Sequence, residues 1–174
     1  MPITPDTKDW TWVIDRPCGE CGFDARRYPK EAIAQSVRDH CAVWDDVLLR
    51  DDVAQRPDDA TWSALEYACH VRDVYGTFDH RLELMLTHDD PVFANWDQDE
   101  TAVEQRYDLQ DPATVARELH DAAWRYAERL DAVSGEQWTR PGTRSNGSRF
   151  TVESLGIYAL HDPYHHVWDV TKDV

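Results

Sequence analysis

Apolar residues recur at helical spacing in four stretches of the chain. In the first stretch, about residues 29–50, the stripe consists of Ile33, Val37, Cys41, Trp44 and Leu48. Steps of three and four residues place such positions on one face of an α-helix. Comparable stripes run through about residues 63–86, 111–134 and from 151 onward. The pattern predicts an all-α fold, a four-helix bundle in which the helices bury their apolar faces against one another.

Local signals mark where these helices begin. Pro29 suits the first turn of the first helix, Ser63 and Glu66 form a capping-box pattern for the second, and Asp111 precedes Pro112 at the start of the third. Residues 1–28 show no helical period, and residues 136–150 are rich in turn residues. We therefore divide the chain into an irregular N-terminal segment, residues 1–28, and a bundle, residues 29–174.

The connection between the second and third helices, residues 87–111, is longer than bundle loops usually are. Long connections cross a bundle from one end to the other or carry part of a site. We therefore expect the second and third helices to run in the same direction, with a short helix near residues 101–107 inside the connection.

The length and net charge of the chain limit the kinds of molecule that it is expected to bind. The 174 residues fit one domain with a full-sized core, and the net charge of −16 would repel nucleic acid and anionic membrane surfaces alike. No stretch has the ~20 apolar residues that a membrane span requires, and no secretory signal is visible. We expect a cytoplasmic protein that acts on a small molecule, with a homodimer left open, whose four cysteines are thiols or metal ligands.

The fourth helix carries a pair of histidines. His161 and His165 are four residues apart, so both imidazoles leave one helix face roughly 6 Å apart, within reach of one divalent metal. Inward-facing histidines also occur as ordinary core residues. Whether this pair binds a metal therefore depends on a third ligand elsewhere in the chain. Pro163 lies between the two and should kink the helix, and such breaks of local regularity tend to mark functional sites.

His70, on the apolar face of the second helix, is the best third ligand. If the second and fourth helices are antiparallel neighbours, His70 and His165 come level within about one turn. His166 points roughly 140° away from the first histidine of the pair and is not expected to share the metal. Three protein ligands leave a position for water or substrate, and Asp73 and Asp162 could accept from imidazole N–H groups.

The N-terminal segment contains a CxxC pair, Cys18 and Cys21. One such pair is half of a structural zinc site, which needs four ligands. It also suits redox chemistry, although no βαβ pattern surrounds it here. The third interpretation is a glycine-supported turn whose thiols stay reduced. The sequence leaves open a second metal site, a redox pair and a simple turn.

Polar side chains elsewhere could complete an active site. In the long connection, Asn95 and Trp96 are candidates for substrate contact, and the Asp97 carboxylate could move a proton near the open metal position. In the turn-rich segment, Arg144 and Arg149 could orient an anionic substrate, or they could form salt bridges on the surface.

The combination of motifs resembles a known family. The motif consists of Trp62, Ser63, Glu66, His70 and Asp73, followed by His161, Asp162 and His165. Over about residues 29–170 the chain resembles the DinB/YfiT-like family of four-helix metalloproteins. The resemblance implies an up-down-down-up bundle with a long crossover between helices two and three. It also implies a divalent metal (zinc, nickel or manganese) held by His70, His161 and His165.

Two functional hypotheses follow. Where members of the resembled family have an activity, it is transfer or isomerisation that depends on a low-molecular-weight thiol such as mycothiol. We therefore expect a metal-dependent S-transferase, isomerase or hydrolase, in which the metal lowers the pKa of a bound water or thiol. The alternative is a non-catalytic, stress-related or partner-binding bundle whose metal is structural. The CxxC-containing segment is a departure from the simple bundle, and it leaves the substrate and reaction open.

Overall fold

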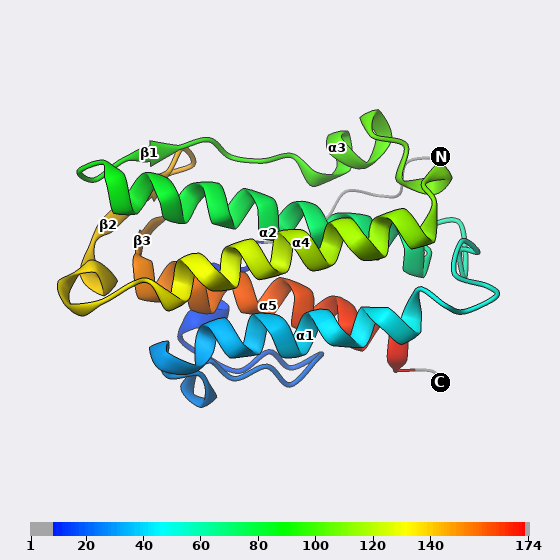
Figure 1. Ribbon diagram of the computed structural model, residues 1–174, viewed down its shortest axis with the longest axis horizontal. Helices are drawn as coiled ribbons and strands as arrows, with labels where there is room; N and C mark the ends of the chain where they lie inside the picture. Colours follow the sequence, from blue (N-terminus) through cyan, green and yellow to red (C-terminus); the bar gives the residue numbers. More distant parts are fainter. Residues whose placement is uncertain (1–8, 173–174) are drawn as a thin grey trace.

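The computed structural model describes residues 9–172, and within them four long helices form the bundle. They are α1 (Ile33–Val47), α2 (Ala64–Thr87), α4 (Pro112–Asp131) and α5 (Val152–Thr171). Helices α1 and α5 run one way along the long axis and α2 and α4 run the other way, as Figure 1 shows. The predicted four-helix bundle with up-down-down-up topology is therefore confirmed.

The helix starts follow the capping signals in the sequence. The Ser63 hydroxyl accepts from the Glu66 backbone N–H, and the Glu66 carboxylate accepts from the Ser63 N–H, so the predicted capping box is present. The side chain of Asp111 caps α4 ahead of its first-turn proline. The first helix begins later than predicted, at Ile33, because Pro29 is extended and a 3-10 turn, Lys30–Ala32, precedes the α-helix.

The core lies where the apolar stripes meet. Helix α4 packs on α1 and α2, and α5 packs on the same two helices from the other side. The stripe of α1 is buried throughout, from Ile33 to Trp44, and α2 contributes a fully buried Tyr75 and Leu82. Burial of several such side chains, each worth roughly 1.5–3 kcal/mol, is what holds the helices together.

The connection from α2 to α4 crosses the whole bundle. It leaves the end of α2 through strand β1 (Val92–Phe93), runs along α2, and forms a short helix α3 (Gln98–Glu104) before α4 begins (Figure 1). The expected short helix is thus present, starting three residues earlier than predicted. The crossover brings the polar end of α3 and the Trp96 region over the α2–α5 side of the bundle, where it lines a cavity.

The structure also contains a small three-stranded sheet at one end of the bundle, which the sequence pattern did not predict. Strand β1 pairs in parallel with β2 (Pro141–Arg144), which pairs antiparallel with β3 (Arg149–Thr151). Phe93 and Phe150 are buried beneath it, and Gly142 lies against Met85 so closely that a Cβ would stand 2.7 Å from the Met85 Cγ. The sheet fixes the position of Arg144 at the edge of the cavity.

The described part of the N-terminal segment, residues 9–28, contains short 3-10 turns and packs along α5. Val13, Cys18 and Phe23 are buried and join the core, while most of the segment is exposed or half-buried. Because the segment packs against α5, its Trp10 lies next to His161 and His165 of that helix.

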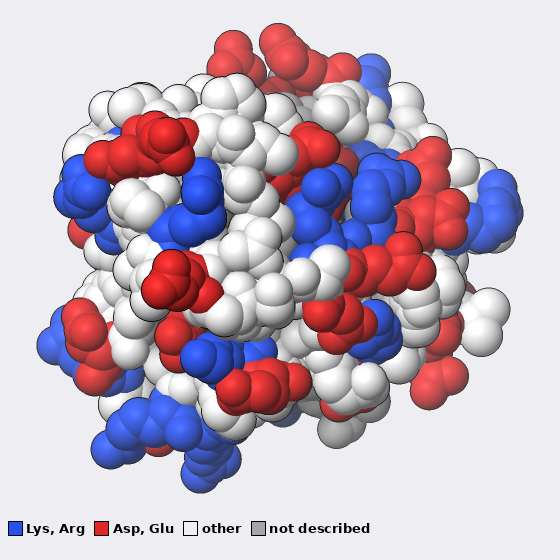
Figure 2. Space-filling view, turned by 60° about the vertical axis from the view of Figure 1, so that its left-hand side comes forward, with Lys and Arg blue, Asp and Glu red and all other residues white. Residues whose placement is uncertain are grey.

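The surface carries both signs of charge. On the face shown in Figure 2, basic and acidic side chains are interspersed, and no broad basic area is visible there. Many of the arginines are paired with carboxylates, for example Arg129 with Asp79 and Arg38 with Asp131. Within residues 9–172, none of the helices combines the length and the apolar character needed to cross a membrane.

Candidate metal centres

Helix α5 presents two overlapping pairs of potential ligands. His161 and His165 form one pair at a spacing of four, and Asp162 and His166 form a second pair at the same spacing, one residue later. One residue along an α-helix is a rotation of about 100°, so the two pairs point in different directions. The structure places the first pair toward the N-terminal segment and the second toward α2.

The first pair meets the two cysteines. Cys18, Cys21, His161 and His165, here called the Cys2His2 group, each offer a ligand atom, and these atoms all lie within 4.8 Å of one another. The Cys18 Sγ lies 3.8 Å from the His165 Nδ1. Three of the residues are buried, and Cys21 is half-buried. The sequence alone did not indicate which other side chains lie near the CxxC pair. The structure places the two histidines of α5 beside it.

The turn that carries the cysteines is held by its own backbone. The Cys18 N–H donates to the Phe23 carbonyl at 2.8 Å, and the Gly22 N–H donates to the Cys18 carbonyl at 3.0 Å. Gly22 has a φ of +76°, a conformation that glycine adopts at little cost. The CxxC is therefore a tight glycine-supported turn, and this turn brings both thiols to one side.

Burial shifts the pKa of three members of the Cys2His2 group, His161, His165 and Cys21. Burial lowers the pKa of His161 to about 4 and lowers that of His165 below its ordinary value, so both imidazoles are neutral at pH 7. Burial likewise raises the pKa of Cys21 to about 12. The His161 Nε2 is buried, and no hydrogen-bond partner for it exists in the described part of the chain.

The second pair meets the histidine of α2. His70, Asp162 and His166, here called the His-Asp-His group, also place one ligand atom each within 4.8 Å of one another. The Asp162 Oδ1 lies 3.0 Å from the His70 Nε2 and 3.4 Å from the His166 Nε2. His70 is completely buried, and its ring stacks on Trp96 and also contacts Trp62.

His166 contacts two carboxylates of its own helix. Its Nδ1 lies 3.0 Å from the Asp169 Oδ2, and its Nε2 lies 3.4 Å from the Asp162 Oδ1. Both ring nitrogens of His166 therefore have a carboxylate oxygen close by.

The charge on Asp162 is stabilised by the same neighbours. Burial alone would raise the pKa of Asp162, but the imidazoles of His70 and His166 outweigh it and hold the pKa well below its usual range. About a third of the Asp162 side chain is exposed, and this part faces the cavity. The site therefore offers an ionised carboxylate and two imidazoles, a mixed oxygen and nitrogen set that suits zinc, nickel or manganese.

Both groups border one cavity of about 610 Å³. Its walls come from the N-terminal segment, α2, the crossover, strand β2 and α5. The lining includes Trp10, Arg81, Trp96, Asp97, Arg144, Tyr158, His161, Asp162, His165 and His166. The ring centroid of Trp10 lies 5.2 Å from that of His161 and 5.3 Å from that of His165, so the N-terminal segment covers these imidazoles.

Two guanidinium groups face this cavity without a carboxylate partner in the described chain. Arg81 is buried, donates to the Ala94 carbonyl, and lies against the rings of Phe78 and Phe93. Burial lowers the pKa of Arg81 to about 10, and the positive charge of the nearby Arg144 contributes to this shift. Although the chain has 34 acidic residues, no ion pair between a carboxylate and either Arg81 or Arg144 occurs among the described residues.

Arg144 reaches the cavity from strand β2. Its guanidinium donates to the Tyr158 hydroxyl, the Ser148 hydroxyl and the Asn146 side chain, at 3.0–3.4 Å. These contacts hold it at the cavity wall. Arg149, predicted alongside it, is not among the residues that line the cavity, because the antiparallel β2–β3 pairing carries it to an exposed position where it pairs with Asp90 at 3.2 Å.

The predicted three-histidine set is not one of the groups of ligand atoms that lie within 4.8 Å of one another among the described residues. His161 and His165 lie together, their ring centroids 5.2 Å apart, but His70 is grouped with Asp162 and His166 instead. His166, expected to point away from the metal, is a member of the second group. The physical reason is the rotation of α5 about its axis, which turns positions 162 and 166, rather than 161 and 165, toward α2.

The remaining predicted residues are also placed. Asn95, Trp96 and Asp97 line the cavity, and the Asp97 Oδ1 caps α3 by accepting from two backbone N–H groups. Asp162 lies beside an imidazole as expected. Asp73 does not: it accepts from Arg72 at 2.8 Å and from the Tyr107 hydroxyl.

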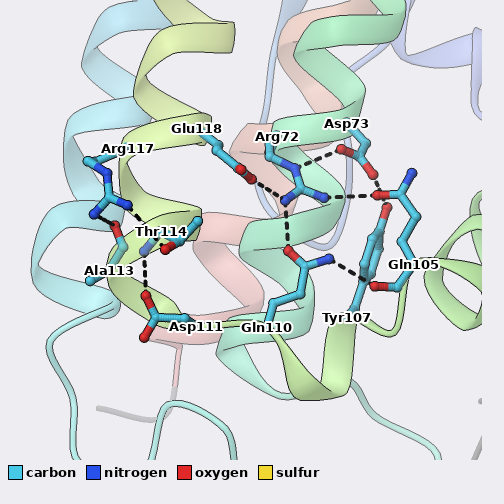
Figure 3. Close-up of polar contacts among 10 residues, drawn as sticks. All are labelled: Arg72, Asp73, Gln105, Tyr107, Gln110, Asp111, Ala113, Thr114, Arg117 and Glu118. Atoms are coloured by element: carbon cyan, nitrogen blue, oxygen red, sulfur yellow. Dashed lines mark hydrogen bonds and ion pairs between the residues drawn. The ribbon is translucent and has the colours of Figure 1, made fainter.

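Figure 3 shows the polar contacts that hold the Asp73 carboxylate. Arg72 also reaches Gln110, Glu118 and Gln105, so the Asp73 carboxylate belongs to a polar network that ties α2 to the crossover and to α4. Sequence reasoning overlooked Arg81, Tyr158 and the Asp162–His166 pair. Only the last had a signal in the sequence, namely the same spacing of four as the histidine pair.

The comparisons with known proteins agree with this architecture. The chain is similar to a solved structure described as "YfiT from Bacillus subtilis is a probable metal-dependent hydrolase with an unusual four-helix bundle topology". The TM-score is 0.72 at 18% sequence identity, over 83% of this chain and 86% of that one. No curated protein matches the sequence. The sequence pattern of the DinB superfamily matches residues 46–170, so this chain belongs to the DinB superfamily.

Proposed function

We propose that this chain is a metal-dependent enzyme that acts on a small anionic molecule, with His70, Asp162 and His166 as the metal ligands. The convergence of these three ligand atoms, two of which belong to the cavity-lining residues Asp162 and His166, is the observation that supports the proposal. Metal ligands with bonds of about 2.0–2.2 Å stand about 2.9–3.4 Å apart at angles of 90–110°, and the Asp162 Oδ1 lies 3.0 and 3.4 Å from the two imidazole nitrogens.

The ligand number fits a catalytic centre better than a structural one. Three protein ligands leave at least one position for water or substrate. A divalent metal bound there would supply a Lewis acid that lowers the pKa of a coordinated water or thiol. The similar YfiT structure is described as a probable metal-dependent hydrolase, which is consistent with this role.

The protein supplies the means to hold an anionic substrate. Arg81 and Arg144 face the cavity with Tyr158 beside them, and neither guanidinium has a carboxylate partner among residues 9–172. A substrate carboxylate or phosphate bound between them would be oriented by charge-assisted hydrogen bonds. Trp96 would offer an aromatic wall for the rest of the molecule, and Asp97 is the candidate for moving a proton at the cavity rim.

The cavity lining suggests where the nucleophile comes from. The described lining contains no serine, threonine, cysteine or lysine. Burial raises the pKa of Cys41 and of Cys69 to about 12, so neither is an activated thiol. The nucleophile would therefore be a molecule from solution, either water in a hydrolysis or a low-molecular-weight thiol such as mycothiol in a transfer or isomerisation. A cavity of about 610 Å³ has room for a thiol and a small electrophile together.

Metal analysis and a reaction screen test this proposal. We would load the protein with zinc, nickel or manganese, then measure bound metal and turnover of activated electrophiles, with water alone and with several thiols. Asp162→Ala and His166→Ala should each lose one metal equivalent and the turnover. His80→Ala, at an exposed histidine on α2, is the matched control and should keep both.

Two outcomes would contradict the proposal. If Asp162→Ala and His166→Ala keep the full metal content while His70→Ala and His161→Ala both lose metal, the three-histidine set predicted from the sequence holds the catalytic metal instead. If the metal is bound as proposed but no thiol or water supports turnover of any electrophile, the non-catalytic, partner-binding alternative is favoured.

A further inference from the structure

We infer that Cys18, Cys21, His161 and His165 form a second metal site, a structural zinc centre that fastens the N-terminal segment to α5. This site does not depend on the proposed function, because it shares no ligand with the His-Asp-His group. The CxxC turn and the histidine pair of α5 are 140 residues apart in sequence and are brought together only by the fold.

The donor set is the first argument. Two thiols and two imidazoles match the composition of closed, four-coordinate zinc sites. The spacing also matches, since the cysteines are separated by two residues and the histidines by three, as in many Cys2His2 sites. Hard cations such as magnesium or calcium prefer oxygen ligands and would not select this group.

The distances are the second argument. Zinc bonds of about 2.3 Å to sulfur and 2.0–2.1 Å to nitrogen, at a tetrahedral angle, place the two ligand atoms about 3.6 Å apart. The Cys18 Sγ and the His165 Nδ1 lie 3.8 Å apart, which is long for a strong hydrogen bond involving nitrogen and close to this value. All four ligand atoms fit within 4.8 Å of one another, so a single ion can reach them.

The surroundings of His165 are the third argument. With Nδ1 turned toward the thiol, its Nε2 lies 3.5 Å from the Glu20 carboxylate. Histidines that bind zinc commonly turn the other ring nitrogen toward a carboxylate, which fixes the ring orientation. Glu20 lies between the two cysteines in sequence, so the turn that supplies the sulfur ligands also supplies this carboxylate.

The site explains why the N-terminal segment is attached where it is. Both cysteines are free thiols in the structure, and the segment packs against α5 with Val13, Cys18 and Phe23 buried. Trp10 and Glu20 of this segment line the cavity. A zinc ion joining the segment to α5 would therefore also fix one wall of the cavity that holds the His-Asp-His group.

The test compares metal content and cobalt spectra of purified protein kept under a reductant. Cys18→Ser/Cys21→Ser should bind one zinc equivalent fewer than the wild type, and Cys69→Ala, at a buried cysteine of α2, should bind the same amount as the wild type. Cobalt-loaded wild type should show the near-ultraviolet thiolate-to-cobalt charge-transfer band and the intense visible bands of a tetrahedral site. The double serine variant should lack the thiolate band.

A structural readout complements these spectra. Chelation of the wild type should expose the N-terminal segment to limited proteolysis and lower the thermal midpoint, whereas the double serine variant should already be cleaved there without chelator. Circular dichroism of that variant should retain the helical signal, because the four long helices do not depend on the segment for their own backbone hydrogen bonds.

Three results would overturn the inference. Equal zinc content in the wild type and the double serine variant would show that the cysteines are not ligands. A Cys18–Cys21 disulfide that forms in zinc-loaded protein as readily as in chelated protein would assign the pair to redox chemistry. If the wild type binds a single metal equivalent, and both the double serine variant and Asp162→Ala lose it, the chain has one metal site and not two. Failure of the His-Asp-His site would instead appear as loss of metal in neither Asp162→Ala nor His166→Ala.

Discussion

The Asp162 Oδ1 on α5 lies 3.0 Å from the His70 Nε2 on α2, although the two residues are 92 positions apart in sequence. This contact joins the fourth long helix to the second at the wall of the cavity. In this contact His70 is paired with Asp162, whereas His161 and His165, the histidines before and after Asp162 on α5, belong to the other group. The chemistry of the chain therefore divides into two neighbouring groups, one of sulfur and nitrogen donors and one of nitrogen and oxygen donors.

Arg81→Met should weaken anion binding and leave the fold at least as stable. The guanidinium is buried without a carboxylate partner, so its removal relieves a desolvation cost and should change the free energy of unfolding by ~0–1 kcal/mol in the stabilising direction. Affinity for inorganic phosphate or a small dicarboxylate should fall at least about tenfold, since a charge-assisted contact worth ~1.5 kcal/mol or more is lost. Calorimetric titration and urea unfolding measure the two effects.

Arg149→Met is the matched control for that substitution. Arg149 forms an exposed ion pair with Asp90 and does not line the cavity, so both quantities should stay within about 0.5 kcal/mol of the wild type. If Arg149→Met weakens anion binding as much as Arg81→Met does, the anion site is not in this cavity.

His40 should make the protein less stable in mild acid. Burial lowers its pKa to about 4 in the folded state from an ordinary value of 6.5, and its Nδ1 is buried without a partner in the described chain. The unfolded chain therefore binds a proton at a higher pH than the folded chain. Stability is unaffected above about pH 7 and is lost as the pH falls from 6.5 toward 4.

His40→Gln should remove this part of the pH dependence. Between pH 7 and pH 5 the wild type should lose about 1–2 kcal/mol more of its free energy of unfolding than the variant does. Urea unfolding of both proteins at the two pH values gives the difference. Identical losses would mean that His40 is solvated or charged in the fold.

Glu66 should contribute stability that disappears at low pH. Burial would raise its pKa, but the Arg56 guanidinium and the Ser63 N–H and hydroxyl outweigh that effect and hold the pKa below its ordinary value of 4.5. The contribution is present above pH 4.5 and is lost as the pH falls below it.

Glu66→Gln keeps the shape of the capping box and removes the charge. It should cost roughly 1–3 kcal/mol at pH 7, because the charged hydrogen bonds to Arg56 become neutral ones, and it should cost little near pH 3. The comparison variant is Glu136→Gln, at an exposed position, which should cost less than ~0.5 kcal/mol. A pH-independent cost would show that packing, rather than charge, is what Glu66 provides.

Gly142→Ala should distort strand β2 and weaken the anion site. A Cβ there would lie 2.7 Å from the Cγ of the buried Met85, so the strand or the side chain must move, at a cost of ~1–3 kcal/mol. Because β2 also carries Arg144, phosphate affinity should fall with stability. Gly19→Ala, where no atom lies within 4 Å of the added Cβ, should change neither.

The sequence by itself determined the framework of this protein. The spacing of apolar residues determined four helices, the caps at Ser63 and Asp111 set where two of them begin, and the length of the crossover required α2 and α4 to be parallel. These features are local, or depend only on chain length, so no tertiary contact is needed to predict them. The candidate metal ligands of α5 were visible for the same reason, since a spacing of four is a property of one helix.

Only the tertiary structure decided which partners meet. A helix carries the pairs 161/165 and 162/166 side by side, and their periodicity does not say which of them faces a given neighbour, because that depends on a rotation of about 100° set by packing across the whole bundle. Packing turned Asp162 and His166 toward α2 and left His161 and His165 to the N-terminal segment. The small sheet was invisible for a related reason, since strands of two to four residues exist only through their pairing.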